Sequence, residues 1–199
     1  MKESNDMNNP IRVKDLRTIV SDVTTEPGYY IWWFNEDDTN TLLSVFDKKD
    51  LAKYKIQMRK MEDGHTYYAL YFGIARDLQE RIKWHLGISP KHTEGAIRSD
   101  TLSTLRNTIA SILTKGVNPI NLPKEIFDVD GILDNCYWEY FPTKTKADAE
   151  KEETARLSKN AEYIFPLNIQ KNHKYLDEKG RILPRKVLSP LRREHKAKF

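Results

Sequence analysis

Hydrophobic residues along the chain gather in three short runs that are rich in aromatic and β-branched side chains. The runs are GYYIWWF (28–34), TYYALYFG (66–73) and CYWEYF (136–141). Such runs have high strand propensity. Turn signals precede the first two, at Pro27-Gly28 and Asp63-Gly64. The pattern therefore predicts three strands.

Helical spacing marks other segments. Asp77, followed three residues later by Glu80, resembles a capping box, and Gly87 supplies a stop, so a short helix should lie between them. Between Asp100 and Gly116 the apolar residues recur at helical spacing. They are Leu102, Leu105, Ile109, Ile112 and Leu113. This second helix should pack on the sheet.

The remaining segments complete the predicted order of elements. A loop with Pro119 and Pro123 leads to the third strand, after which Thr145 should cap a helix that runs to about Tyr163. Val13 to Val20 can form a short lead-in element. Residues 35–64 are mostly polar and charged, and we expect a partly helical excursion there. The order of the main elements is β, β, α, α, β, α.

Composition limits the classes of protein that need considering. The 199 residues, 39% of them hydrophobic, suffice for one domain, and a charged fraction of 31% with a mean hydropathy of −0.70 describes a soluble protein. No apolar run approaches the roughly 20 residues that span a bilayer, and residues 1–18 lack a secretory signal. We expect a cytoplasmic protein with no membrane partner. The single cysteine, Cys136, excludes an internal disulfide and a thiolate zinc site.

Positive charge is concentrated at one end of the chain. Residues 171–199 contain ten of the 33 Lys and Arg but three of the 29 Asp and Glu, so the excess behind the net charge of +4 lies there. Such a stretch can contact phosphates, although a solvated basic tail is an equally good interpretation.

Two strand beginnings with tyrosine and glycine are followed by a helix that carries an arginine and a histidine. The tripeptides are Gly28-Tyr29-Tyr30 and Tyr71-Phe72-Gly73, while Arg81 lies ten residues after Tyr71 and His85 four further on. One tripeptide alone would mean little, but the order and spacing are specific. The chain resembles the GIY-YIG endonuclease superfamily over about residues 27–172, with Tyr29 and Phe72 in place of isoleucine.

The resemblance implies a fold and a domain organisation. We expect an α/β (α+β) domain with a small central three-stranded, mainly antiparallel sheet flanked by helices. Residues 35–64 would be an insertion between the first two strands, because this interval is much longer than in compact members. A lead-in (1–26) would precede the nuclease-like domain (27–172), and a basic tail (173–199) would follow it. The segments STLRNTIASIL and PLNIQKN are similar to those of bacterial relatives.

The resemblance also implies roles for individual residues. Catalytic roles fall to Tyr30, Tyr71, Arg81, His85 and Glu153, and substrate-binding roles to Gly28, Gly73, Arg106 and Asn168. Tyr30 would activate the attacking water and Tyr71 would orient water or phosphate. A tyrosine can do the former only if cationic neighbours favour its phenolate. Taken alone, the tyrosines could be ordinary strand aromatics and the glycines ordinary turn residues.

Helix geometry adds an argument for Arg81 and His85. They lie one turn apart and share a face, so the pair can point together at a substrate. Arg81 would clamp the phosphate with its planar guanidinium, and His85 would position or donate to a phosphate oxygen. Without this spacing, Arg81 would be taken for a solvated surface residue.

Helix geometry also selects Glu153 among the nearby acids. Ala149, Leu157, Ala161 and Ile164 define an apolar stripe, at about 100° per residue, that is centred near position 153. Glu150 lies at the edge of this stripe, whereas Glu152 and Glu162 point away. An acid within an apolar stripe is costly unless it is paired or binds an ion. Glu153 would therefore hold Mg²⁺ or Mn²⁺, and a structural ion pair with a Lys or Arg is the alternative.

The sequence thus predicts a metal-dependent endonuclease that hydrolyses phosphodiester bonds in DNA. Two other interpretations are a non-catalytic nucleic-acid-binding module on the same fold and an unrelated α/β interaction protein whose motif match is accidental.

Overall fold

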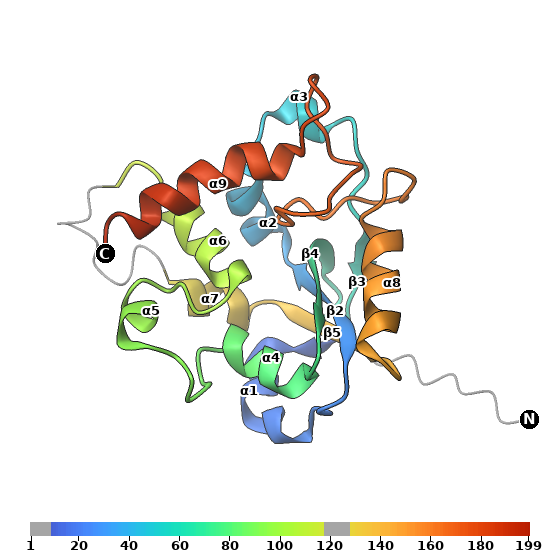
Figure 1. Cartoon of the computed structure of the whole chain (residues 1–199), viewed down its shortest axis with the longest axis vertical. Coiled ribbons are helices and arrows are strands. Elements are labelled where there is room, and N and C mark those ends of the chain that lie inside the picture. The colour runs from blue at the N-terminus through green and yellow to red at the C-terminus, as the bar shows by residue number, and fades with distance from the viewer. Residues whose placement is uncertain (1–8, 118–127) are drawn as a thin grey trace, which may run out of the picture.

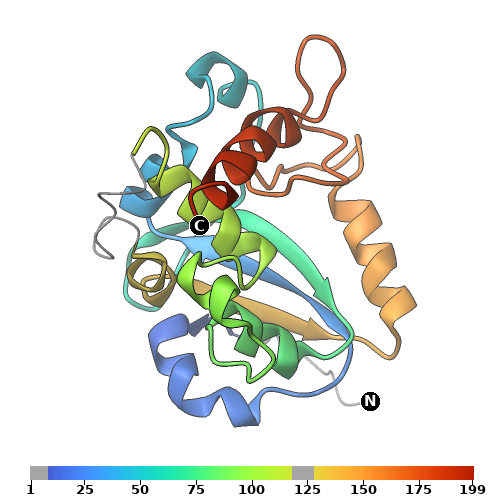
Figure 2. The same cartoon turned by 60° about the vertical axis from the view of Figure 1, so that its left-hand side comes forward.

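Five strands form one antiparallel sheet within residues 9–117 and 128–199, the part of the chain that a computed structural model describes. The strands are β1 (Ile11–Arg12), β2 (Gly28–Phe34), β3 (Met58–Lys60), β4 (Thr66–Ala75) and β5 (Tyr137–Pro142). Their order across the sheet is β1-β5-β2-β4-β3, and each neighbouring pair is antiparallel. The sheet is visible in Figures 1 and 2.

The prediction of a three-stranded sheet is correct for the centre and wrong for the edges. The three predicted strands are β2, β4 and β5, which form the middle of the sheet with β2 at its centre. The two additional strands are short, because β1 has two residues and β3 has three. Segments of this length carry no period-2 pattern that a sequence reading could detect.

Helices surround the sheet. They are α1 (Val13–Ile19), α2 (Glu36–Leu43), α3 (Lys48–Leu51), α4 (Leu78–His85), α5 (Glu94–Arg98), α6 (Thr104–Leu113), α7 (Val129–Asp134), α8 (Lys146–Arg156) and α9 (Leu183–Lys196), with a 3₁₀ turn at Val20–Asp22. In Figure 1, α8 lies on one side of the strands and α4, α6, α7 and α9 lie on the other. The helices that the structure describes include none with the length and apolar character needed to cross a membrane.

Side chains of β2 alternate between two apolar layers. Tyr30, Trp32 and Phe34 belong to the larger core, which the helices opposite α8 complete. Ile31 and Trp33 point into a smaller core that includes Leu157, just beyond α8. This alternation explains why GYYIWWF is apolar throughout, because both faces of the strand are buried.

The predicted helix caps are confirmed, and one predicted helix end is wrong. Asp77 and Thr145 cap α4 and α8 through their side chains, and Gly87 has a φ of 72° after α4. However, α8 ends at Arg156 and not near Tyr163. The chain turns away after Leu157, and the backbone N–H of Ile164 bonds to the carbonyl of Lys55. Tertiary pairing thus overrides the helical pattern of the sequence.

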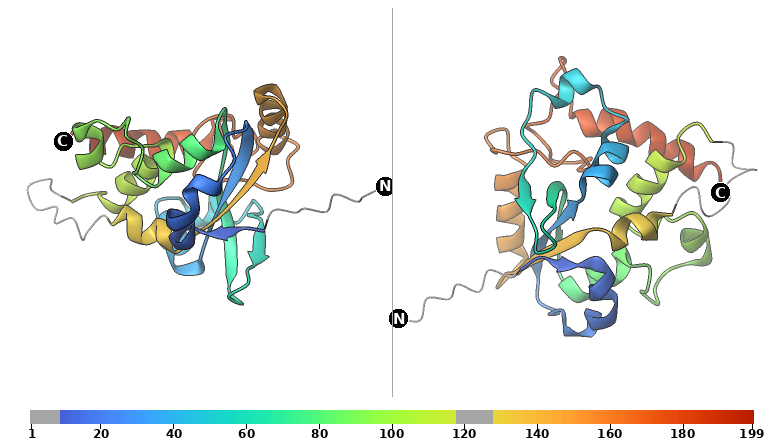
Figure 3. Two further views of the ribbon diagram at one scale, coloured as in Figure 1. Left: turned by 90° about the horizontal axis from the view of Figure 1, so that it is seen from below. Right: turned by 180° about the vertical axis from the view of Figure 1, so that it is seen from behind.

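The insertion and the basic C-terminal stretch are both structured. Residues 35–64 contain α2, α3 and β3, so the expectation of a partly helical excursion is confirmed. Within the basic stretch, α9 buries Leu183 and Leu188 and packs along α6, as the views in Figure 3 also show. The predicted loop around Pro119 and Pro123 lies outside the described residues.

Candidate active site

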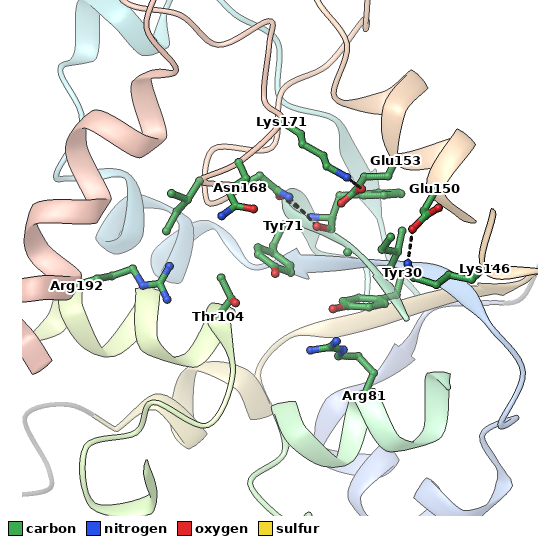
Figure 4. A pocket seen from close by; sticks show the side chains of 15 residues that line it. Tyr30, Tyr71, Arg81, Thr104, Lys146, Glu150, Glu153, Asn168, Lys171 and Arg192 are labelled. Carbon is green, nitrogen blue, oxygen red and sulfur yellow. Dashed lines mark hydrogen bonds and ion pairs between the residues drawn. The ribbon is translucent and has the colours of Figure 1, made fainter. Parts of the chain in front are cut away.

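A cavity of about 470 Å³ opens between β4, α4, α6, α8 and α9. Residues from widely separated parts of the chain line it. The lining includes Tyr30, Tyr71, Gly73, Arg81, Thr104, Lys146, Glu150, Glu153, Asn168, Lys171 and Arg192. Figure 4 labels all of these except Gly73. The structure therefore brings together six of the nine predicted site residues, and the other three are His85, Gly28 and Arg106.

Tyr30 enters this cavity through a gap that Gly73 provides. The two residues face one another in the register of β2 and β4. A Cβ atom on Gly73 would collide with the ring and hydroxyl of Tyr30. The YIG-like glycine is therefore needed for space, so that the phenol of the neighbouring strand can lie across the backbone.

His85 lies behind Tyr30 and does not line the cavity. Its ring is 1% exposed, and Nε2 is 3.0 Å from the Tyr30 hydroxyl while Nδ1 is 2.9 Å from the hydroxyl of Ser103. Both ring nitrogens are thus engaged within the protein. The expectation that His85 meets a phosphate oxygen directly does not match this geometry, and its contact with the cavity runs through Tyr30.

The pKa values of this group reflect its burial. Burial, helped by the nearby Tyr71, raises the pKa of Tyr30 above its ordinary value, and Arg81 opposes the rise. Burial also raises the pKa of Tyr71. Burial and the cations Arg81 and Arg106 hold the pKa of His85 well below its ordinary value. In the resting protein the tyrosines therefore carry their protons and His85 is neutral.

Each of the two carboxylates in the cavity is paired with a lysine. Glu153 accepts a hydrogen bond from Lys171 at 2.6 Å, and Glu150 is bonded to Lys146 one helical turn before it (Figure 4). The side chain of Glu153 is 14% exposed, whereas that of Glu150 is 45% exposed. The predicted helix face is confirmed over α8, since Glu153 lies between buried Ala149 and buried Leu157. Ala161 and Ile164, which the sequence pattern places in the same apolar stripe, lie beyond the end of the helix.

Asn168 fixes the strand that carries Tyr71 and Gly73. Its side-chain oxygen accepts from the backbone N–H of Phe72 at 2.9 Å, and its amide donates to the carbonyl of Phe72 at 2.8 Å. Both polar groups of this buried side chain are thus used on the backbone of β4. Its contacts are those of a positioning residue at the wall of the cavity.

A comparison with protein families supports the motif assignment. The model of a GIY-YIG catalytic domain matches residues 28–194, which is most of the chain. The chain belongs to the GIY-YIG nuclease superfamily. No curated protein and no solved structure matches it, so the assignment rests on this family match. The GIY-YIG match ends within α9, so it includes most of the basic C-terminal helix.

Two predicted substrate-binding residues of the GIY-YIG domain lie away from the cavity. Arg106 is 3% exposed, and its guanidinium bonds to Asp100, to Asp130 and to the carbonyl of His85. At Gly28, an added Cβ would collide with the carbonyl of Phe141 on β5. Both residues therefore have structural contacts, and their positions do not support substrate binding.

The donor set for a divalent cation is small. GIY-YIG nucleases generally use divalent metals, yet among the described residues no three His, Cys, Asp or Glu side chains are grouped to hold one. Mg²⁺ often binds proteins through one or two carboxylates and completes its shell with water and phosphate oxygens. Glu153 fits that pattern as a single ligand in the wall of a polar cavity, with Glu150 nearby.

Sequence reasoning missed five polar residues of the cavity, namely Thr104, Lys146, Gln170, Lys171 and Arg192. Arg192 had a detectable signal, because Leu183, Val187, Leu188 and Leu191 recur at helical spacing and predict an amphipathic helix. Lys171 had none. It has a left-handed backbone with φ 58°, which is uncommon for a residue other than glycine and which the sequence does not mark.

Proposed function

We propose that this protein is a metal-dependent endonuclease that hydrolyses phosphodiester bonds in DNA. The observation that supports this most strongly is the convergence of Tyr30, Tyr71, Arg81 and Glu153 on one polar cavity. These four side chains come from β2, β4, α4 and α8. They are of the types that a nuclease needs for water activation, phosphate binding and cation binding.

Tyr30 can take a proton from the attacking water only if it passes its own proton on. His85 Nε2, at 3.0 Å, is the acceptor in contact with its hydroxyl when Nδ1 carries the imidazole proton toward Ser103. As the water oxygen attacks phosphorus, the water proton moves to Tyr30 and the tyrosine proton moves to His85. Burial, with a smaller contribution from Arg81 and Arg106, holds His85 neutral in the resting protein. The arriving phosphate charge favours the proton transfer because it offsets the two arginines.

Arg81 would stabilise the negative charge that develops on the phosphate oxygens. Its side chain lines the cavity on the α4 wall, and no carboxylate in the described part of the chain forms an ion pair with it. Tyr71 would orient the phosphate or the water beside Tyr30. A divalent cation held by Glu153 would add charge stabilisation on the phosphate oxygens. The bond from phosphorus to the leaving sugar oxygen breaks as the water oxygen attacks, and that oxygen takes a proton from solvent. His85 then returns its own proton through Tyr30 to solvent.

The direct test is cleavage by the purified protein. Supercoiled plasmid and labelled single-stranded, duplex and branched oligonucleotides would be incubated with Mg²⁺ or Mn²⁺, and with EDTA. We expect nicking or cleavage that requires the cation. Binding without cleavage on all of these substrates would contradict the proposal and favour a non-catalytic nucleic-acid-binding module. RNA oligonucleotides in the same assay test the choice of DNA, which rests on the family resemblance.

A further inference from the structure

Arg192 reaches the cavity from the opposite side to α8. It lies on α9, and its guanidinium points toward Thr104 and the cavity in Figure 4. With the Asn107 amide oriented so that its oxygen faces the guanidinium, that oxygen accepts from Nε at 3.1 Å and from Nη2 at 2.9 Å. Asn107 is 2% exposed on α6, so this contact fixes the direction of the Arg192 side chain.

The charge of Arg192 is not compensated within the described residues. No salt bridge joins it to an acid, and Asn107 offers a neutral oxygen. Burial lowers the pKa of the guanidinium below its ordinary value, and the neighbouring Tyr71 opposes this only weakly because it carries its proton. Arg106, by contrast, is buried nearby but bonds to two aspartates. A half-buried, unpaired cation is costly unless an anion joins it.

The other charges of the cavity indicate how many anions it accepts. Its two glutamates are already bonded to its two lysines. The two cations left over in the described lining are Arg81 and Arg192. They lie on different walls, with Tyr71 between α9 and the rest of the site (Figure 4). The cavity therefore has capacity for two separate negative charges.

We propose that Arg192 binds a second phosphate of the substrate strand, next to the one that Arg81 stabilises. This inference rests on the proposed function, because a nucleic-acid strand is the ligand that presents phosphates at regular intervals. Asn107 uses the N–H of Nε and one N–H of Nη2, so a phosphate would take the remaining N–H groups of Nη1 and Nη2, which can bind it in a bidentate manner. Arg192 thus sets the register of the strand, and α9 is part of the substrate-binding wall.

The test compares Arg192→Gln with Arg193→Gln. Arg193 is the next residue of α9 and is exposed to solvent, so it supplies a control with the same change of charge. Binding of a labelled oligonucleotide would be measured in EDTA at several salt concentrations. Loss of one phosphate contact should weaken binding about tenfold near 0.1 M salt and lower the salt slope by about 0.9. Arg193→Gln should do neither, and Arg192→Lys should keep most of the slope.

A scan of the substrate backbone makes the test specific. Single methylphosphonates, which remove one phosphate charge each, would be placed at successive positions of the oligonucleotide. One position should weaken binding to the wild type but have no further effect on Arg192→Gln. If every position affects both proteins equally, the inference is overturned, whereas the proposed function stands as long as the wild type cleaves. Equal effects of Arg192→Gln and Arg193→Gln would also overturn it.

Discussion

At the scale of single residues, a substitution of Arg81 best distinguishes an effect on the chemical step from an effect on DNA binding. Its guanidinium would act mainly on charge that appears in the transition state, so Arg81→Ala should lower kcat about 100- to 1,000-fold while the Kd for DNA changes little. Single-turnover cleavage and a binding assay in EDTA would measure the two. Arg76→Ala is the matched control, because Arg76 is a nearby but exposed cation. Equal losses of rate and affinity would remove Arg81 from the catalytic residues.

Glu153 and Glu150 can be distinguished by metal binding. Glu153→Gln should abolish the stabilisation that Mn²⁺ or Mg²⁺ gives in a thermal-shift titration, whereas Glu150→Gln should retain it. In EDTA, Glu153→Gln should change the Tm only slightly, because the lysine it frees is 54% exposed and can be hydrated. A normal titration of Glu153→Gln with cleavage intact would refute the metal assignment, and loss only in Glu150→Gln would move it to that residue.

At the scale of elements, the pairing of β2 with β4 depends on one glycine. Gly73→Ala places a methyl group where the Tyr30 ring lies, so the ring must leave His85 or the strands must separate. We expect a lower Tm and loss of cleavage. In Gly95→Ala the new methyl group meets nothing within 4 Å on α5, so this control should fold as well as the wild type or slightly better. Full activity of Gly73→Ala would show that the close approach is not required.

The elements also show which parts of the fold a sequence reading can reach. The strands β2, β4 and β5 and the caps of α4 and α8 follow from local patterns, and the period of α8 correctly places Glu153 between Ala149 and Leu157. What escapes prediction depends on contacts between distant segments. The Lys171 partner of Glu153 and the end of α8 are both of this kind.

His85 and Arg106 show the same limit within the site. Helical spacing correctly predicted that His85 lies one turn from Arg81 on the same face of α4. It could not predict that only Arg81 lines the cavity, whereas His85 lies behind Tyr30. For Arg106, the sequence could not show that its guanidinium already donates hydrogen bonds to Asp100 and Asp130. Family resemblance locates such residues along the chain but does not give their partners.

At the scale of the whole molecule, His85 should make stability depend on pH. Folding holds the pKa of His85 below the value of about 6.5 that it has in an unfolded chain, so the unfolded state binds more protons in acid. Above about pH 6.5, neutral His85 does not lower the free energy of unfolding. As the pH falls below that value, the free energy of unfolding decreases by about 1.4 kcal/mol per pH unit until the pKa of His85 in the folded protein is reached.

Between pH 7 and pH 5, the free energy of unfolding should decrease less steeply in His85→Gln than in the wild type. Urea unfolding at a series of pH values between 7 and 5 would measure it, and His65→Gln serves as an exposed control. Parallel curves for His85→Gln and the wild type would show that the imidazole does not resist protonation. His92 and His195, whose pKa values are also lowered by burial, remain in both proteins and keep some acid dependence.

The separation of β2 from β4 along the chain has a consequence for how the protein folds. Residues 35–65 lie between these two strands, and β5 begins only at Tyr137. The equilibrium cost is modest, since tripling the length of a flexible loop adds only about 1 kcal/mol of closure entropy. The kinetic cost is larger, because sheets assembled from distant segments fold slowly. Helices such as α6 need only local contacts, whereas Tyr30 meets Gly73 and Tyr71 only once β2 and β4 have paired. A partly folded chain can therefore contain much of the helical structure while the cavity and its chemistry are still absent.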